Sequence, residues 1–459
     1  MIIEELLKQQ RELIKEANPL SYLAIRRATE RMPGGVPSSI FSVAPFPLTI
    51  SRGAGASIED LDGHEYVDYG NGYGTSVFGH AHPLLVEAIS EQAASGVFFG
   101  ALSESVTEWA ELLAERFNLD WVRFSPSGTE ANMDAIRIAR GLTERERIVK
   151  IEGAYHGTYP GLLISTSPNV QDAPTPETPL PLGKGISEPL TDTLAFNDLA
   201  GAAALLEKRE HAAIIVEPIL FNVGAIFPAA GYLAGLRSIC DRTGTQLIFD
   251  EVKTGVAVAW GGCEEYFQVQ PDLKTFGKGI GGGIAAGAVG GRNPDLYNEI
   301  SYFRIPHLGT FSGNHLVARA GATALKILDK PAYAQLESHR RYLACQLESI
   351  INEYRLPCYL VGAAAKNCVV WANPEYGHLD NYRDYAARVS GPLGQLQWAY
   401  MINNRVWLTP GRDEQTTHSV QHEDADADRY AEAFRGFAKL LSESGALAEI
   451  DPKKAGSAA

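Results

Sequence analysis

Residues 246–252 read Gln246-Leu247-Ile248-Phe249-Asp250-Glu251-Val252, in which the apolar run at 246–250 ends in the carboxylate of Asp250. A short apolar run between helical patterns is typical of a strand buried on both faces. Similar runs occur at 121–124, 147–151 and 212–216, and helical patterns lie between several of them, for example at 130–140 and 232–241. Strands that alternate with helices predict an α/β fold with a mainly parallel sheet covered on both faces.

The same patterns divide the chain into three stretches. Residues 70–325 carry the alternation and are expected to form one large domain. Residues 326–459 are expected to form a smaller α+β domain, with strands at 366–371 and 405–408 and a helix at 424–441. The N-terminal segment, residues 1–69, is expected to join that smaller domain.

Two local segments have patterns of their own. Apolar residues near the N-terminus follow helical spacing and predict an amphipathic helix that packs on a partner subunit; they are Ile3, Leu6, Leu7 and Ile14. Residues 168–189 contain six prolines, which exclude a regular helix or a central strand. This Pro-rich segment is either a lid over a site or a solvated connection.

Composition excludes several classes of function. The 459 residues include 40 Lys and Arg against 55 Asp and Glu, a net charge of −15 that argues against nucleic acid or an anionic membrane as main partner. Five scattered cysteines without C-x-x-C spacing argue against a disulfide framework or a zinc ribbon. The cysteine spacing leads us to expect no metal site. No signal-peptide core or membrane span is visible, so we expect a cytoplasmic protein.

Two motifs offer groups for an anionic, flat ligand. Ser127-Gly128-Thr129 opens a helical pattern, and free backbone N–H groups there form either a phosphate cradle or an ordinary helix cap. Asp250 ends a strand, where open parallel sheets bind their ligands. Its carboxylate can pair with a protonated ring nitrogen or can cap the next helix.

Lys278 lies between two glycines in a largely uncharged run. An amine in such a place can have a lowered pKa and form a Schiff base with a carbonyl, although a lone lysine is more often solvated. Gly277, Gly279 and Gly282 also satisfy G-x-G-x-x-G, which suggests a nucleotide site. The residues that follow are small and Gly-rich, so the helix that a dinucleotide fold needs is missing.

The order of the motifs is more specific than any one of them. Ser127-Gly128-Thr129, Tyr155-His156-Gly157, Glu217-Pro218, Asp250-Glu251-Val252, Lys278 and Gly309-Thr310 follow one another along the chain. This series resembles the class III aminotransferases of the fold-type I pyridoxal-phosphate enzymes, and within them the glutamate-1-semialdehyde aminomutase-like branch. The resemblance covers residues 20–440 and includes Met32-Pro33-Gly34-Gly35-Val36, Asp62-Gly63-His64 and Gly79-His80-Ala81-His82-Pro83.

The resemblance implies a large domain with a seven-stranded sheet, a smaller domain, and pyridoxal 5′-phosphate as cofactor. It implies that Lys278 forms the Schiff base and moves the substrate proton, and that Asp250 keeps the ring nitrogen protonated. Val252 then packs beneath the ring and Tyr155 above it. The other implied cofactor contacts are Ser127, Gly128, Thr129, His156, Glu217 and Asn222. Thr310 is expected to reach the phosphate in the neighbouring subunit of a homodimer, and the Pro-rich segment falls where the aminomutase has a gating loop.

Departures from the family pattern concern the substrate. The aminomutase has an Arg shortly after the Pro-Gly-Gly segment, but residues 36–42 here contain none. Tyr73 stands where the aminomutase has a Trp, and Arg412 is either a replacement carboxylate anchor or a surface residue. Glutamate-1-semialdehyde is therefore in doubt as substrate.

The sequence therefore favours an aminotransferase that moves an amino group from an amine or amino acid to a keto acid or aldehyde by a ping-pong mechanism. The alternative within the same site is a 2,1-aminomutase. A nicotinamide oxidoreductase that uses the glycine run and a regulatory cofactor-binding protein are the competitors from other classes.

Overall fold

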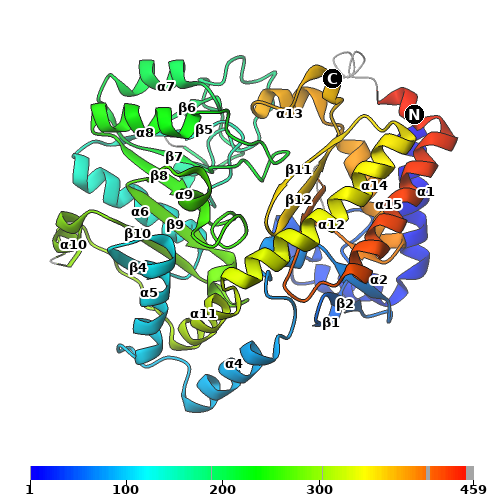
Figure 1. Ribbon diagram of the computed structural model, residues 1–459, viewed down its shortest axis with the longest axis horizontal. Helices are drawn as coiled ribbons and strands as arrows, with labels where there is room; N and C mark the ends of the chain where they lie inside the picture. Colours follow the sequence, from blue (N-terminus) through cyan, green and yellow to red (C-terminus); the bar gives the residue numbers. More distant parts are fainter. Residues whose placement is uncertain (1, 188, 302, 410–413, 451–459) are drawn as a thin grey trace. The chain divides into compact units, whose positions relative to one another are not determined.

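The computed structural model describes residues 2–187, 189–301, 303–409 and 414–450. These residues fall into two compact units, whose elements are labelled in Figure 1. The first unit takes its residues from 1–82, 334–378 and 387–459, and the second from 83–333 and 379–386. The predicted three-stretch domain division stays a prediction.

A seven-stranded sheet forms the centre of the second unit. Its strands lie in the order β4 (Trp121–Ser125), β10 (Gly287–Gly291), β9 (Leu273–Gly277), β8 (Gln246–Asp250), β7 (His211–Val216), β5 (Arg147–Ile151) and β6 (Thr191–Leu194). Neighbours from β9 to β6 are parallel, and only β10 runs against its neighbours β4 and β9. Every residue of β7, β9 and β10 is buried, which requires cover on both faces because successive side chains point to opposite faces. The predicted fold class is confirmed.

Strand β10, which lies between β4 and β9, is one that the sequence patterns did not reveal. In its sequence, Gly-Ala-Val-Gly-Gly, only Val289 is of the β-branched or aromatic kind that is typical of strands. A Cβ at Gly287 would lie 2.1 Å from the Ser127 carbonyl oxygen, and one at Gly290 would lie 2.7 Å from the Trp121 carbonyl oxygen. Glycine is therefore required here because the backbones of neighbouring segments approach too closely for a side chain.

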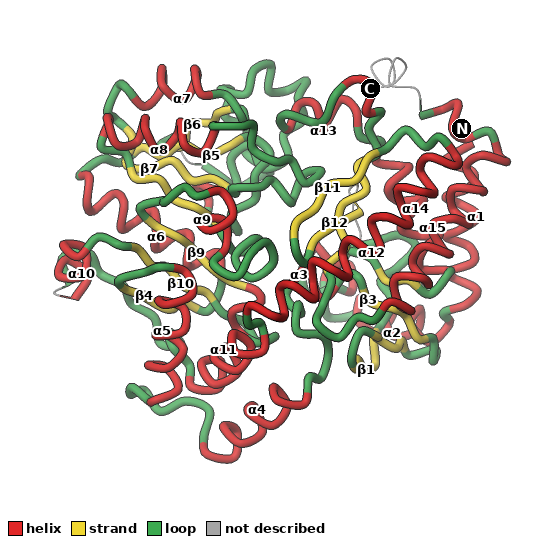
Figure 2. Tube along the Cα trace, viewed as in Figure 1, coloured by secondary structure: helices red, strands yellow, loops and turns green. Residues whose placement is uncertain are grey.

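Helices cover this sheet and separate its strands along the chain (Figure 2). The helices between residues 83 and 329 are α4 (Pro83–Ser95), α5 (Glu104–Phe117), α6 (Gly128–Thr143), α7 (Leu199–Leu206), α8 (Tyr232–Thr243), α9 (Gly262–Phe267), α10 (Pro294–Ser301) and α11 (His315–Ile327). Helix α6 packs across β7 to β10, and α8 packs on β8. The predicted helices at 130–140 and 232–241 lie within α6 and α8 and are confirmed.

The first unit contains two small sheets and a group of helices. One sheet has the order β1 (Ile50–Ala54), β2 (Ser57–Asp60), β3 (Glu65–Asp68) and β13 (Val406–Trp407), and the other has β11 (Tyr359–Ala363), β12 (Lys366–Val370) and β14 (Glu414–Thr417). The helices are α1 (Ile2–Ala17), α2 (Pro19–Thr29), α3 (Asn71–Gly74), most of α12 (Lys330–Tyr354), α14 (Gly391–Asn403) and α15 (Asp424–Ser444). The predicted strands at 366–371 and 405–408 and the helix at 424–441 are confirmed within one to three residues.

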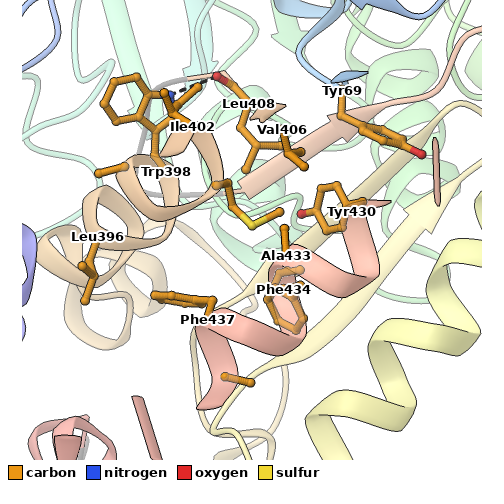
Figure 3. Close-up of a cluster of buried hydrophobic side chains, with 14 of the residues drawn as sticks. Tyr69, Leu396, Trp398, Ile402, Val406, Leu408, Tyr430, Ala433, Phe434 and Phe437 are labelled. Carbon is orange, nitrogen blue, oxygen red and sulfur yellow. Dashed lines mark hydrogen bonds between the residues drawn. The ribbon is translucent and has the colours of Figure 1, made fainter. Parts of the chain in front are cut away.

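Large apolar and aromatic side chains from α14, α15 and β13 form the core of the first unit (Figure 3). Phe434 and Phe437 of α15 are fully buried in it, and the Trp398 ring nitrogen donates to the Leu408 carbonyl oxygen at 3.1 Å. Helix α1 packs on α14 and buries Ile3, Leu6, Leu7 and Ile14. The expectation that this face packs on a partner subunit is wrong, because its own chain already covers it.

The Pro-rich segment is irregular, as its prolines predict, but residues of the second unit hold it at several points. Tyr382 Oη donates to the Pro168 carbonyl oxygen at 2.9 Å, and Arg383 donates to the carbonyl oxygens of Ala173 and Pro174 at 2.9 and 3.1 Å. Both belong to helix α13 (Tyr382–Arg388). Among the described helices, none is both long and apolar enough to cross a membrane.

Candidate active site

The candidate residues follow the carboxyl ends of strands that point the same way. Strands β5, β7, β8 and β9 are parallel, and β4 has the same direction because β10 runs against both β4 and β9. Their carboxyl ends therefore meet at one edge of the sheet, which is where open parallel sheets bind ligands. The motif residues that follow these strands come from five separate stretches of the chain.

Three of these stretches touch at Val252. A Cβ at Gly128 would lie 2.8 Å from both methyl groups of Val252, and a Cβ at Gly277 would lie 3.1 Å from one of them. The same Gly277 position is 3.3 Å from the Gly128 Cα. The start of α6, the turn after β8 and the end of β9 are thus in direct contact, and they leave no room for a side chain at Gly128.

The start of α6 has the expected cap. Ser127 Oγ accepts from the Glu130 backbone N–H at 3.2 Å and lies 3.1 Å from the Glu130 carboxylate. Thr129 Oγ1 accepts from the Thr158 N–H at 3.2 Å, and a Cβ at Gly157 would lie 2.3 Å from that hydroxyl. The turn after β5 therefore packs against the helix start, and the helix dipole favours an anion there.

The Asp250 carboxylate is buried and receives three hydrogen bonds. Oδ2 lies 2.7 Å from His156 Nδ1 and accepts from Asn132 Nδ2 at 2.8 Å, while Oδ1 accepts from the Val252 N–H at 2.9 Å. These contacts fix the position of the carboxylate at the end of β8. Only 1% of His156 is exposed, so its ring holds Asp250 rather than lining an open pocket.

Asn132 is a site residue for which the sequence suggested no role. Its Nδ2 binds Asp250, and its Oδ1 accepts from Thr275 Oγ1 at 2.5 Å, so one amide links α6, β8 and β9. The available signal was its position on α6, one turn after Gly128 and on the same buried side as Ala131 and Ala135. A polar residue on a buried helix face needs a partner.

Glu217, Tyr155 and Asn222 form a second hydrogen-bonded group. Glu217 Oε1 accepts from the Tyr155 backbone N–H at 2.9 Å, and Oε2 accepts from Asn222 Nδ2 at 2.8 Å. Burial raises the pKa of the Glu217 carboxyl group, an effect that the positive charge of His156 opposes. The Tyr155 ring is 37% exposed, so one part of it remains available for contact.

Lys278 follows β9 directly and has an unusual backbone conformation. Its φ of 51° lies in the left-handed region, which a non-glycine residue adopts at a cost and which is common at functional sites. The pKa of its amine is lowered to about 8, first by burial and next by the positive charge of Lys253. Asp250 and Glu217 act in the opposite direction. An amine with this pKa is partly neutral near neutral pH and can act as a nucleophile.

Three further residues were predicted at the site, and they are Thr310, Tyr73 and Arg412. Thr310 is exposed in the turn that precedes α11, in the second unit. Tyr73 belongs to the first unit, where its Oη donates to the Ile40 carbonyl oxygen at 2.9 Å and its ring meets Phe41 edge to face. Arg412 lies outside the described residues.

Comparison with known proteins identifies the family. The model of the class-III aminotransferases matches residues 41–359, well over half of the chain. The chain belongs to the class III aminotransferase family. Enzymes of this family use pyridoxal 5′-phosphate.

Individual class III relatives carry two kinds of name. Glutamate-1-semialdehyde 2,1-aminomutase 2 of Brevibacillus brevis is 38% identical, over 88% of this chain and 95% of its own. The crystal structure of an omega-transaminase from Sphaerobacter thermophilus is 31% identical, with a TM-score of 0.83 over 92% of this chain and 97% of its own. A glutamate-1-semialdehyde aminomutase structure from Pseudomonas aeruginosa PAO1 is 25% identical, with a TM-score of 0.88 over 96% and 98%.

Proposed function

We propose that this chain is a pyridoxal-phosphate-dependent aminotransferase that moves an amino group from an amine or amino acid to a keto acid or aldehyde. The observation that carries the proposal is that Asp250 and Lys278 stand at the carboxyl ends of two neighbouring parallel strands, β8 and β9. One supplies a buried carboxylate held by three donors, and the other an amine whose pKa is about 8. A ring with a basic nitrogen and an aldehyde needs both groups.

The residues present fit pyridoxal phosphate. The start of α6 at Gly128 offers backbone N–H groups and the positive end of the helix dipole to a phosphate. Thr129 adds a hydroxyl beside them, and the partly exposed Tyr155 offers an aromatic face for a flat ring. The Asp250 carboxylate suits a protonated ring nitrogen, because opposite charges favour each other strongly where water is excluded.

When bound, pyridoxal phosphate supplies an electron sink for the substrate carbon that carries the amine. In this proposal the Lys278 amine holds the cofactor and later accepts the proton of that carbon as a general base. His156 and Asn132 fix the position of the Asp250 carboxylate, which would hold a proton on the ring nitrogen. Val252, in contact with Gly128 and Gly277, forms an apolar wall beside the ring.

Transfer between two substrates is our first choice, and intramolecular transfer by an aminomutase is the second. Residues 36–42 contain no arginine, which the family pattern uses to hold the carboxylate of glutamate-1-semialdehyde. The names of several relatives favour the aminomutase. The two functions differ in one requirement, because an aminotransferase needs a separate acceptor for every turnover.

We also propose a homodimer in which Thr310 contacts the phosphate bound by the neighbouring subunit. Thr310 is exposed in the single chain, as such a contact requires. The adjoining residues Leu308 and Phe311 are large, apolar and exposed, which suits a protein interface.

The first experiment is a visible absorption spectrum of the purified protein with pyridoxal phosphate, followed by a panel of amines. We expect a yellow protein that loses its colour with certain donors, and turnover that stops in Lys278→Ala while the fold is kept. Lys208→Ala, on an exposed turn, is the control. A colourless protein, or full turnover in Lys278→Ala, would contradict the proposal.

A second experiment separates transfer from isomerisation. Each donor that bleaches the protein is supplied with and without a keto acid or aldehyde, and products are counted over many turnovers. We expect turnover only with the acceptor and parallel lines in double-reciprocal plots. Sustained isomerisation of one amino-aldehyde without any acceptor would instead establish the aminomutase.

A further inference from the structure

A buried lysine in the sheet of the second unit has no part in the function proposed above. Lys150 lies in β5, and 0% of it is exposed. Its Nζ donates to the carbonyl oxygens of Ala154 and Ile164 at 2.8 and 2.7 Å and to Thr166 Oγ1 at 3.1 Å. The ammonium group of a lysine carries three N–H donors, so each of them has an acceptor here. Burial of such a group is costly unless it is hydrogen-bonded, and these contacts meet that need.

One of the three acceptors belongs to the peptide bond that leads into Tyr155. The C=O of that bond is the Ala154 carbonyl, which accepts from Lys150. Its N–H is that of Tyr155, which donates to Glu217 Oε1 at 2.9 Å. Because a peptide bond is planar, contacts at its C=O and its N–H together fix the orientation of the whole unit. Lys150 and Glu217 therefore fix the backbone from which the Tyr155 ring extends.

The other two acceptors lie where the Pro-rich segment begins. The residue between them, Ser165, donates its N–H to the Leu180 carbonyl oxygen at 2.7 Å and accepts from the Gly153 N–H at 2.8 Å. The turn before Tyr155 is therefore bonded to the same short stretch that pairs with Leu180 of the Pro-rich segment. The Lys150 amine contacts both the turn and this stretch, so it joins them a second time.

We propose that Lys150 is a positioning residue which, by holding the Ala154 carbonyl and the stretch at 164–166, fixes the Tyr155 ring for contact with the cofactor. This inference rests on the proposed function and deepens it, since that function gives the Tyr155 ring a face for pyridoxal phosphate. Because Lys150 acts through the backbone before Tyr155, its effect on cofactor binding should depend on the Tyr155 ring.

Hydrogen exchange tests whether Lys150 holds the turn, and it requires no cofactor. Lys150→Met fills a similar space but cannot donate. We expect amide exchange in residues 153–157 to be about tenfold faster in this variant, with exchange in β7 and β8 unchanged. Lys208→Met, on an exposed turn, is the matched control and should leave all these rates unchanged. Unchanged exchange in residues 153–157 of Lys150→Met would overturn the proposal.

A double-mutant cycle tests whether Lys150 acts through Tyr155. Absorption titration gives the dissociation constant of pyridoxal phosphate in the natural protein, Lys150→Met, Tyr155→Leu and the double variant. We expect Lys150→Met to weaken binding about tenfold in the natural protein but less than about twofold in Tyr155→Leu, where no ring is left to position. A general structural role would weaken binding by the same factor in both backgrounds, and that result would refute the positioning role.

A substitute variant is available if Lys150→Met does not fold. Lys150→Gln has its amide nitrogen one bond nearer the backbone, and we expect it to give the same two results. Failure of the proposed function is a separate result, because a natural protein that binds no pyridoxal phosphate refutes that function whatever the exchange rates are. A natural protein that binds the cofactor, with unchanged exchange or equal factors in the cycle, keeps the function and removes this inference alone.

Discussion

Position 128 accepts only glycine, because a larger residue would collide with Val252. Its missing side chain lets α6 begin directly against Val252, where a Cβ would be 2.8 Å from two methyl groups. The same helix start carries the backbone N–H groups that would bind the phosphate. Packing against Val252 therefore requires glycine beside the proposed anion site.

Gly128→Ala should weaken pyridoxal phosphate binding at least tenfold and lower stability by about 1–3 kcal/mol, because Val252 must move to admit the methyl group. Spectroscopic titration with the cofactor and thermal melting measure the two effects. Gly183→Ala is the matched control, since a Cβ there meets nothing within 4 Å and the backbone is not left-handed. Equal effects in both variants would refute the packing argument.

At the scale of elements, helix α13 holds the Pro-rich segment in place through hydrogen bonds. Arg383 pairs with the Glu152 carboxylate at 2.7 Å, and the same guanidinium reaches two carbonyl oxygens of the segment. Glu152 is 1% exposed, and a buried charge that loses its partner is costly. A segment tied in this way is less free than its six prolines alone suggest.

Arg383→Ala should therefore release residues 168–176. We expect amide hydrogen exchange there to become at least tenfold faster, while exchange in the strands of the sheet stays unchanged. Arg383→Lys tests the fork geometry, because a lysine keeps the charge but not the set of fixed donors. If the exchange rate of residues 168–176 is unchanged in Arg383→Ala, then Arg383 does not hold this segment.

At the scale of the whole molecule, the second unit exposes large apolar residues that a single chain does not cover. Leu102 is 78% exposed and Leu308 is 77% exposed, with Phe99, Phe303 and Phe311 also exposed. Single exposed apolar residues are ordinary, but several close to the proposed Thr310 contact suit an interface between two copies.

Light scattering should accordingly give a mass of about twice 49.7 kDa. Leu308→Asp should shift the protein toward the monomer and weaken cofactor binding, because a buried, unpaired carboxylate is unfavourable in an interface. Leu13→Asp, on an exposed position of α1, is the matched control. A natural protein that is monomeric at micromolar concentration would refute the dimer.

Sequence alone determined much of this protein, because several of its structures are local. The strands β5 and β8 match their predicted bounds, since short, largely apolar stretches between helical patterns predict buried strands. The cap at Ser127 also followed from four adjacent residues. The position of Asp250 at the ligand-binding end of a strand followed from the apolar run before it, whereas the role of Lys278 followed from the family resemblance.

Only the tertiary structure decided what depends on distant segments. Strand β10 has glycine at positions 287 and 290 because the carbonyl oxygens of Ser127 and Trp121 lie too close for a side chain, and no local sequence pattern records such contacts. Asn132 and His156 become partners of Asp250 only when α6, β5 and β8 pack together, although 118 and 94 residues separate them along the chain. The cover of α1 by α14 has the same origin. Local patterns state which face of an element is apolar or polar, but the partner of that face is chosen by packing in three dimensions.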